Sequence, residues 1–391
     1  MAERALIKTI DLKEIPMQIR AAVLDQMGLP APFAQSRPLR IDTIELRDPG
    51  PGEVLIKIAA AGICHSDLSV IEGVRPRPLP MVIGHEAAGV VIAVGPYVDD
   101  LVVGDHVVTV FVASCGHCVE CSGGRPALCG PGAVAGAAGT LLRGDRRLQR
   151  GEQVLNHHSG ISAFAEYAVV STRSLVRVAR DIPLEHAALF GCAVLTGVGA
   201  ATNTASIKLG STVAIVGMGG VGLAAQLGAL AAGASQVIAI DTNAEKLAMA
   251  KSLGAQHMFN AADPDLVEAI RDLTGGGVDV ALEFAGASAA LQTAWKVGKR
   301  GSEVVTAGLA RPDATFEVPM VGLVADERTL RGSYMGSSVP SRDIPRYLEL
   351  FRLGRLPIDK LVTHRLTLDE INVGMDRLRD GEAVRQIITF D

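Results

Sequence analysis

Apolar and polar positions follow two different patterns along the chain. From about Ile19 to Val178, short β-branched runs such as VLIKIAA, GVVIAVG and DHVVTV are separated by glycine and proline turns, which is typical of an irregular β-rich domain. From about Val194 to Tyr334, apolar strands such as TVAIVG, QVIAID, VDVALEF and SEVVTAG alternate with alanine- and leucine-rich stretches. This rhythm predicts a parallel sheet wrapped by helices.

The tail from about Met335 follows neither pattern. It mixes a helical stretch, RDIPRYLELFRLG, with short strands and ends in QIITF. Because it has no alternating β-α units of its own, we expect it to return to the first domain. We therefore assign residues 1–193 and 335–391 to one domain and residues 194–334 to the other. The glycine-, alanine- and arginine-rich segment 131–160 is expected to be a long loop.

Length and charge narrow the class of protein. The chain has 391 residues, 48% of them hydrophobic, which exceeds what one core usually holds and favours two domains. No uncharged apolar stretch is long enough to cross a bilayer, and the N-terminal residues carry charges throughout, so we expect a cytoplasmic protein without a signal sequence. A formal net charge of -5 argues against a nucleic-acid partner. The densest basic cluster is interpreted as a solvated loop and comprises Arg143, Arg146, Arg147 and Arg150.

Four of the six cysteines form a compact set with the spacing C-x2-C-x2-C-x7-C. They are Cys115, Cys118, Cys121 and Cys129. Short spacers with glycine and proline turns let one loop surround a tetrahedral zinc ion, and four thiolates leave that ion no open position. We predict a structural zinc site. A pair of disulfides is the alternative, although such clusters more often bind metal in chains without a secretory signal.

A glycine-rich turn follows the apolar strand at residues 212–216. In the sequence GMGGVG, Gly217 makes the tight turn, Gly219 lets the backbone approach a pyrophosphate, and Gly222 lets the next helix pack against the strand. Gly220 and Val221 lie in the same turn, where the helix N-terminus favours phosphate. Asp241 ends the next strand, where a carboxylate takes the ribose hydroxyls and repels a 2'-phosphate, so we predict NAD over NADP.

Two short polar clusters and one cysteine remain. The clusters are GICHSD at residues 62–67 and GHE at residues 84–86, and Cys192 follows Gly191. Taken alone, a histidine more often makes hydrogen bonds that stabilise the fold than it binds a metal ion. A Gly-Cys pair usually reflects close packing.

The order of these motifs along the chain resembles that of the zinc-dependent alcohol dehydrogenases of the medium-chain dehydrogenase/reductase superfamily, from about Arg20 to Phe390. The resemblance implies an α/β fold, with a GroES-like β-rich catalytic domain that holds both zinc sites and a Rossmann doubly wound parallel sheet that binds NAD. It also implies reversible hydride transfer between an alcohol and its aldehyde or ketone. Zn2+ lowers the pKa of the alcohol, an alkoxide forms near neutral pH, and its carbon gives hydride to the nicotinamide.

The same resemblance assigns catalytic roles. The protein ligands of the catalytic zinc are implied to be Cys64, His85 and Cys192. Glu86 matches the acid behind the metal, which approaches zinc when ligands exchange. Asp67 matches the carboxylate that orients the His85 ring, and Ser66 matches the hydroxyl that accepts the alcohol proton and passes it outward.

Further positions match the family's cofactor and substrate contacts. Asn243 and Lys246 match adenosine-ribose contacts, Arg385 matches the arginine at the pyrophosphate, and His65 faces the same phosphates. Thr196 and Val221 match residues packed against the nicotinamide, and Phe284 is a further predicted cofactor contact. Phe111 matches an aromatic wall of the substrate pocket.

One departure concerns the proton relay. Many relatives carry a histidine five positions after the first zinc cysteine, and here that residue is Ser69. Serine is no base at neutral pH. The relay therefore ends in water or His65, or proton release is slower.

Two other readings stay open. A glutathione-dependent formaldehyde dehydrogenase, which acts on S-(hydroxymethyl)glutathione, shares both zinc sites, but it places an arginine shortly after the fourth cysteine, where this chain has GPGA at residues 130–133. The second alternative is a non-catalytic structural protein that binds zinc and NAD. The presence of the complete catalytic set of residues argues against this alternative. Arg75 and Arg77 lie near where relatives line the outer substrate pocket, and we favour exposed loop residues over contacts for polar or acidic alcohols.

We therefore predict an alcohol dehydrogenase with two zinc ions per subunit and NAD, acting on a small-molecule alcohol or aldehyde. We expect a homo-oligomer, with a dimer favoured over a tetramer, and no nucleic-acid or membrane partner.

Overall fold

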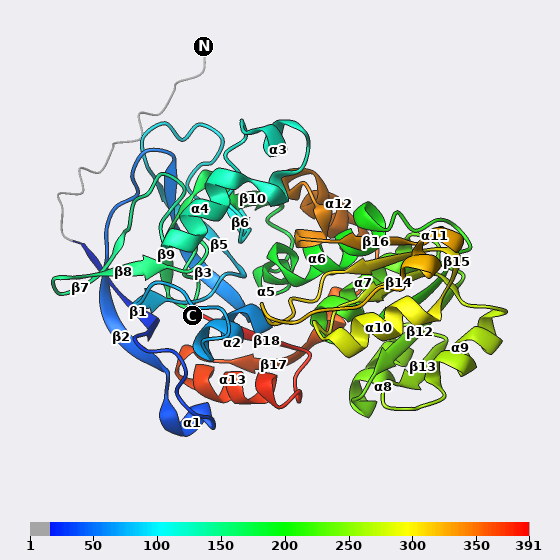
Figure 1. The fold of residues 1–391 in the computed structure, drawn as a ribbon. Coiled ribbons are helices and arrows are strands. Elements are labelled where there is room, and N and C mark those ends of the chain that lie inside the picture. Colours follow the sequence, from blue (N-terminus) through cyan, green and yellow to red (C-terminus); the bar gives the residue numbers. More distant parts are fainter. Residues whose placement is uncertain (1–15, 391) are drawn as a thin grey trace, which may run out of the picture.

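Three β-sheets organise the chain in the computed structural model, which describes residues 16–390 (Figure 1). Two sheets are built mainly from the first half of the chain, and the third belongs to the segment with alternating strands and helices. The expectation of no signal sequence depends largely on residues 1–15, which lie outside the described part of the chain.

The first sheet closes into a small barrel in the order β1-β2-β7-β8-β4. Its strands are β1 (Met17–Leu24), β2 (Leu39–Leu46), β4 (Met81–Val82), β7 (Leu148–Arg150) and β8 (Gln153–His157). The short helix α1 (Phe33–Ser36) connects β1 to β2 and buries the Phe33 ring.

The second sheet has the order β10-β6-β5-β3-β18-β17, and β9 pairs with β3 beside it. The strands are β3 (Glu53–Ile63), β5 (Ala87–Val94), β6 (His106–Thr109), β9 (Tyr167–Ser171), β10 (Leu175–Val178), β17 (Val362–Leu366) and β18 (Arg385–Thr389). The tail therefore returns to the N-terminal half, because β18 pairs antiparallel with β3.

Pairing within this sheet brings the two polar clusters together. β3 and β5 run antiparallel, with Ala61 opposite Ala87. The end of one strand and the beginning of the other therefore meet at the same edge of the sheet. The residues directly after β3 and directly before β5 lie at that edge, and α2 (His65–Ile71) starts there.

The third sheet is parallel throughout and has the order β13-β12-β11-β14-β15-β16. Its strands are β11 (Thr212–Val216), β12 (Gln236–Asp241), β13 (His257–Asn260), β14 (Val278–Glu283), β15 (Gly298–Thr306) and β16 (Thr329–Gly332). Numbered within this sheet, the order is that of a dinucleotide-binding fold, with the switch point beside its first strand, β11. The predicted doubly wound sheet is confirmed.

The remaining helices pack around the sheets (Figure 1). Those of the parallel sheet and its approach are α6 (Ala193–Gly199), α7 (Gly220–Ala231), α8 (Ala244–Ser252), α9 (Leu266–Thr274), α10 (Ser288–Val297) and α11 (Met320–Ala325). The others are α3 (Val119–Ser122), α4 (Gly130–Ala138), α5 (Leu184–Ala187), α12 (Pro340–Arg352) and α13 (Ile371–Arg379).

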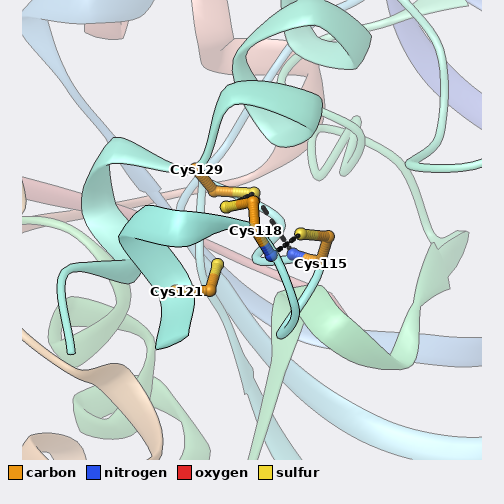
Figure 2. A group of neighbouring side chains, drawn as sticks. All are labelled: Cys115, Cys118, Cys121 and Cys129. Atoms are coloured by element: carbon orange, nitrogen blue, oxygen red, sulfur yellow. Dashed lines mark hydrogen bonds between the residues drawn. The ribbon is translucent and has the colours of Figure 1, made fainter. Parts of the chain in front are cut away.

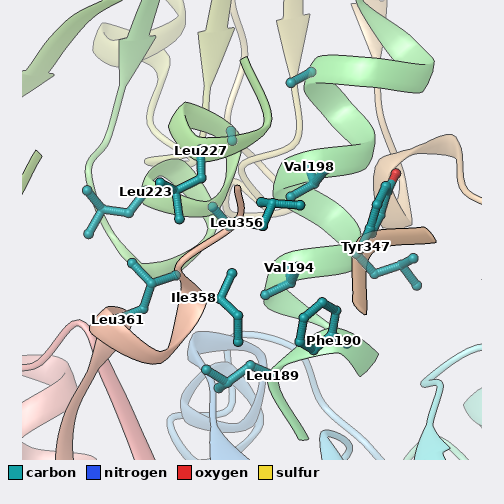
Figure 3. Packing of buried hydrophobic residues seen from close by; sticks show 14 of the residues in the cluster. Leu189, Phe190, Val194, Val198, Leu223, Leu227, Tyr347, Leu356, Ile358 and Leu361 are labelled. Carbon is teal, nitrogen blue, oxygen red and sulfur yellow. The ribbon is translucent and has the colours of Figure 1, made fainter. Parts of the chain in front are cut away.

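A buried apolar cluster joins α6 to α7 and to the tail (Figure 3). Small residues let the two helices approach, since a Cβ on Gly197 would lie 2.2 Å from the Val221 carbonyl oxygen. Leu356, Ile358 and Leu361 of the tail are fully buried in the same cluster, and burying each such side chain stabilises the fold by roughly 1.5–3 kcal/mol. This packing holds the first turn of α6 in place relative to α7 and the tail.

Within residues 16–390, no single helix is long and apolar enough to cross a membrane. One bent pair, Leu184–Gly191 with Ala193–Thr204, passes that test by length and composition alone.

The expectation of a long loop at 131–160 is wrong. The segment contains α4 and the hairpin of β7 and β8, which complete the barrel. Its glycines and Pro131 obscure the helix α4, which is capped by Cys129 and by Gly139. Gly139 has the left-handed conformation, which glycine adopts without strain.

The interpretation of the arginine cluster as a solvated loop is also wrong for most of its members. Arg147 pairs with the buried Glu53 at 2.7 Å. Arg150 pairs with Asp25 at 2.6 Å and with Asp42 at 2.7 Å. These ion pairs connect the hairpin to β2, to β3 and to the residue directly after β1. Among the four arginines only Arg143 is exposed.

Candidate functional site

Four residues that are far apart in the sequence meet where β3 ends and β5 begins. Cys64 follows β3, His85 and Glu86 precede β5, and Cys192 precedes α6. Their candidate ligand atoms all lie within 4.8 Å of one another, and all four residues are buried. Two thiols and an imidazole are the donors that a catalytic zinc ion prefers, so the residues present fit such an ion.

The distances within this set are short. The Sγ atoms of Cys64 and Cys192 are 4.0 Å apart, and Cys192 Sγ lies 3.5 Å from His85 Nε2. The hydrogen bond between the two sulfur atoms lowers the pKa of Cys64 well below its usual value and raises that of Cys192. The two thiols therefore differ in acidity, and Cys64 is the more readily deprotonated of the two.

Asp67 stands behind His85 and fixes its orientation. Its Oδ1 lies 2.8 Å from His85 Nδ1, and its Oδ2 accepts a hydrogen bond of 3.1 Å from the Cys64 amide. Burial alone would lower the pKa of His85, but the negative charge and hydrogen bond of Asp67 raise it well above its usual value. The carboxylate thus leaves Nε2 facing the thiols and makes the ring a stronger base.

His158 is a member of this group that the sequence did not reveal. Its Nδ1 lies 3.2 Å from Asp67 Oδ1 and accepts a hydrogen bond from the Gly84 amide at 3.2 Å. Its ring also stands edge-on to that of His85, with centroids 5.3 Å apart. The only available signal was the His157-His158 pair, which lay in the segment expected to be a loop.

Glu86 and Arg385 form a buried pair on the other side of the set. Arg385 Nη1 lies 3.5 Å from Glu86 Oε2 and 3.3 Å from the Ile63 carbonyl oxygen, to which it donates. Burial raises the pKa of Glu86 to about 7, although Arg385 opposes the shift. Nε and Nη2 of Arg385 are buried without a partner within the described part of the chain, so this guanidinium retains donors for an anion.

The relay residues lie on α2. Ser66 is half-buried in the first turn, and its hydroxyl makes no hydrogen bond within residues 16–390, which leaves it free for a substrate. Ser69 instead donates to the His65 carbonyl at 2.8 Å. Desolvation lowers the pKa of His65, Cys64 opposes this shift, and the charges of Arg385 and Lys246 add to it. Two of the predicted cofactor contacts therefore act electrostatically on His65.

The four remaining cysteines form a second candidate metal centre (Figure 2). Their sulfur atoms lie within 4.8 Å of one another, and within residues 16–390 all six cysteines are free, which argues against the disulfide alternative. Amide groups point at the sulfurs: Cys115 donates to Cys129 Sγ at 3.2 Å and Cys118 to Cys115 Sγ at 3.3 Å. Hydrogen bonds from the His117 and Cys118 amides help to lower the pKa of Cys115 to about 6. This donor set fits a closed, structural zinc site.

The glycine turn has the geometry that a dinucleotide requires. A Cβ on Gly222 would lie 1.9 Å from the Gly217 carbonyl oxygen, whereas a Cβ on Gly219 would face open space. Arg385 stands at the N-terminus of α7, since its Nε would lie 2.3 Å from a Cβ on Gly220. Free amides, an open approach and an unpartnered guanidinium fit a pyrophosphate.

Asp241 lies at this turn, where its Oδ2 accepts from the Met218 amide at 2.6 Å and its Oδ1 from the Asn243 amide at 2.8 Å. Asn243 caps α8, accepting from the amides of Glu245 and Lys246. Its side-chain oxygen is therefore occupied structurally, a role that the sequence prediction did not include. Lys246 Nζ lies beside Gly381 of the tail, 3.5 Å from the position of an added Cβ.

The other predicted contacts occupy the space between the glycine turn and the buried ligand set. Thr196 is one helical turn beyond Cys192 on α6, and its amide donates to the Cys192 carbonyl at 2.9 Å. Val221 packs where α6 and α7 meet. The Phe284 ring lies against the turn, with Cδ2 3.6 Å from an added Cβ on Gly222.

Phe111 lies edge-on to His85, with ring centroids 5.8 Å apart, and edge-on to Tyr334 at the same distance. Tyr334 is an aromatic neighbour that sequence reasoning treated only as a domain boundary. It also lines a cavity of about 390 Å³ between the cysteine loop and the carboxyl ends of β15 and β16. A row of aromatic rings therefore runs from His85 to this cavity.

Family comparisons agree with this geometry. Residues 50–180 match the model of the alcohol dehydrogenase GroES-like domain, and residues 220–352 match that of the zinc-binding dehydrogenase.

Curated relatives match over almost the whole chain. The S-(hydroxymethyl)glutathione dehydrogenase of Synechocystis sp. is 35% identical over 96% of this chain and 100% of its own length. The NDMA-dependent alcohol dehydrogenase of Amycolatopsis methanolica is 39% identical over 95% of this chain and 99% of its own length. Among solved structures, the benzyl alcohol dehydrogenase of Acinetobacter calcoaceticus superposes with a TM-score of 0.89, at 34% identity, over 96% of this chain and 100% of its own.

Fold, ligand sets and comparisons together define a zinc-binding dehydrogenase. The chain belongs to the zinc-dependent alcohol dehydrogenases of the medium-chain dehydrogenase/reductase superfamily. It is an oxidoreductase that uses zinc and a nicotinamide cofactor, as the sequence predicted.

Proposed function

We propose that this protein oxidises alcohols with NAD+, using a catalytic zinc ion held by Cys64, His85 and Cys192. The observation that carries the proposal is the convergence of these three buried side chains, with Asp67 bonded to the far side of the His85 ring. Bound there, zinc makes an alcohol oxygen more acidic, and a bound nicotinamide accepts the hydride.

The chain's own residues do the remaining work. Asp67 holds the His85 ring with Nε2 toward the thiols. Phe111 lies against His85 and excludes water from one side of the site. Ser66 is placed to accept the alcohol proton, and because Ser69 is bonded to its own helix, His65 or water passes the proton on. Glu86 is balanced between Arg385 and the ligand set, where it can assist ligand exchange.

The preferred cofactor is NAD rather than NADP, because the Asp241 carboxylate lies at the glycine turn, where it would repel a 2'-phosphate. We expect kcat/KM for NAD+ to exceed that for NADP+ by about a hundredfold, and Asp241→Ser to reduce that ratio to about tenfold or less. The measurement is steady-state alcohol oxidation with each cofactor, followed by absorbance.

The control is Asp263→Ser, an exposed acid on the nucleotide-binding side outside the turn, which should leave the ratio unchanged. A wild-type preference for NADP+ would overturn the assignment. One relative is named for its dependence on NDMA, so the assay includes NDMA as an added acceptor. Turnover only with NDMA would show that free NAD+ is not the oxidant.

Ser66→Ala should lower kcat by about a hundredfold, the usual scale for removing a positioned proton-transfer group. The half-buried Ser66 hydroxyl has no protein partner within the described residues, so its removal leaves no unsatisfied group in the fold. Single-turnover hydride transfer measures the effect. Ser69→Ala, which removes only a bond to the helix backbone, is the matched control and should change kcat less than threefold or so.

Retention of full activity by Ser66→Ala would place the proton acceptor elsewhere, whereas an equal loss in both variants would indicate that α2 itself is perturbed.

Two zinc ions per subunit form part of the proposal, since two separate ligand sets converge within the described residues. The four-cysteine set has no non-thiol member and no neighbouring relay group, which supports a structural role.

A glutathione adduct is the second candidate substrate, supported by the Synechocystis relative. The segment after Cys129 forms α4 and reads GPGA, without an arginine to hold a glutathione carboxylate. Assays with formaldehyde in the presence and absence of glutathione distinguish the two substrates.

We also propose a homo-oligomer, with a dimer favoured. The edge strand β16 is exposed along its length, and α11 beside it exposes Met320, Val321 and Val324 at 81%, 79% and 77%. Apolar surface next to an unpaired strand edge favours a second copy of the chain, which sedimentation analysis can detect.

A further inference from the structure

Two arginines after α2 lie beside the active site without an acidic partner. Arg75 and Arg77 are half-buried, and no ion pair within residues 16–390 involves either one. Their segment continues directly from the helix that carries Ser66, and the Arg75 amide donates to the Ser69 carbonyl at 3.0 Å. A guanidinium withdrawn from water without a counterion is unfavourable, so this arrangement calls for an anion.

The side chain of Arg75 reaches across to the parallel sheet. Its Nη2 donates to the carbonyl of Ala310, in the loop that follows β15. The preceding residue, Leu309, lines the cavity of about 390 Å³ together with Tyr334. Arg75 therefore stands at the rim of that cavity, and its bond to a neutral carbonyl leaves the positive charge uncompensated.

The charges of both arginines act on Tyr334, which lines the cavity. Burial raises the pKa of Tyr334, the nearby Cys192 adds to that shift, and the positive charges of Arg77 and Arg75 oppose it. Tyr334 lies edge-on to Phe111, which lies edge-on to His85. The bond of Arg75 to Ala310 holds its charge next to the cavity to which this aromatic row leads, and Arg77 follows two residues later on the same segment.

The cavity itself has the character of a site for an anionic molecule. Its walls are mostly apolar, no acidic residue lines it, and Arg125 of the cysteine loop supplies a further positive charge. Its volume falls within the range of small-molecule sites. The cofactor phosphates have a different set of partners, because Arg385 and the Gly217–Gly222 turn lie together at the N-terminus of α7.

We propose that the physiological substrate is an alcohol that carries a carboxylate, and that Arg75 and Arg77 bind this carboxylate while the hydroxyl faces Cys64, His85 and Cys192. The inference rests on the proposed function and adds the substrate class. The carbinol C–H bond breaks with its electron pair passing as hydride to NAD+, the hydroxyl proton leaves through Ser66, and the C–O bond becomes C=O. The carboxylate is unchanged and serves only for binding, where a planar guanidinium pairs with it well.

The test compares matched substrates that differ only in the carboxylate. The pairs are benzyl alcohol with 4-(hydroxymethyl)benzoate, and 1-pentanol with 5-hydroxypentanoate, each at saturating NAD+. The measured quantity is the ratio of kcat/KM for the acid to that for the neutral alcohol. We expect about tenfold or more in favour of the acid in at least one pair, mainly through KM. The ratio should fall as ionic strength rises from about 0.02 M to about 0.5 M.

Arg75→Gln and Arg77→Gln should each reduce the ratio by about tenfold, and Arg77→Lys, which keeps the charge, should restore part of it. Arg143→Gln is the matched control, because Arg143 is exposed on the far connection between α4 and β7, and it should leave the ratio unchanged. Both substrates of a pair are measured with the same preparation of each variant. Partial unfolding therefore lowers both values of kcat/KM equally and leaves their ratio unchanged.

Oxidation of neutral alcohols without preference for the acid, or a preference that neither arginine variant alters, would overturn this inference alone. Failure to oxidise every member of both pairs would instead overturn the proposed function on which it rests.

Discussion

Cys64→Ser is expected to abolish alcohol oxidation while leaving a folded chain that still binds NAD+ and one zinc ion. Cys64 supplies one of three buried ligands at the β3 edge, none of which belongs to the four-cysteine loop. Loss of a catalytic metal removes several kcal/mol of transition-state stabilisation, so kcat should fall by about a thousandfold or more. Metal analysis, cofactor binding and thermal unfolding of the purified variant measure the three effects separately.

The matched substitution is Cys118→Ser in the second set, which should have the opposite pattern. A closed thiolate site contributes to folding directly, so Tm and expression should fall, and residual folded protein should retain turnover per catalytic zinc. A fully active wild-type enzyme with a single zinc per chain would contradict the two-site assignment, and so would an active Cys64→Ser enzyme.

Gly222→Ala is expected to damage both the fold and dinucleotide binding. The new methyl group would lie 1.9 Å from the Gly217 carbonyl oxygen, and backbone cannot move aside without opening the turn. Such overpacking costs about 1–3 kcal/mol or more, and the displaced amides should weaken NAD+ binding by about a hundredfold. Thermal unfolding without cofactor and titration with NADH measure the two effects.

Gly219→Ala separates the two causes, because its methyl group faces open space and no positive φ strains it. We expect an unchanged Tm without cofactor and about tenfold weaker binding, since the methyl group would occupy the approach of the pyrophosphate. Gly136→Ala, also facing open space but in α4, should alter neither. Normal affinity in Gly219→Ala would mean that the cofactor does not approach this turn closely.

The sequence predicted the features that follow from local spacing. The four-cysteine loop and the glycine turn are each contained in a short segment, and the structure brings each of them together as its spacing implied. The parallel sheet followed from the alternation of strands and helices. The dispersed residues Cys64, His85 and Cys192 do converge, but their own spacing carried no such information. They were found through the order of motifs that the family shares.

Features that depend on packing were not predicted. His158 reaches Asp67 only because β8 runs beside β4 in the barrel, a pairing between distant segments. Tyr334 contacts Phe111, which follows a strand of a different sheet, and the spacing of apolar residues along the chain does not indicate that contact. The segment 131–160 is not a loop as expected, because glycine and proline weaken the helix signal of its alanines. The contacts that stabilise it, such as that of Arg147 with Glu53, come from elsewhere in the chain.

Arg385 couples one strand pairing to two binding elements. Arg385 begins β18, which pairs with the end of β3, and its guanidinium reaches both Glu86 and the N-terminus of α7. A shift of β18 along β3 would therefore displace a contact of the catalytic ligand set and a contact of the glycine turn together. The register of this single strand pair thus contributes to the distance between the zinc site and the cofactor site.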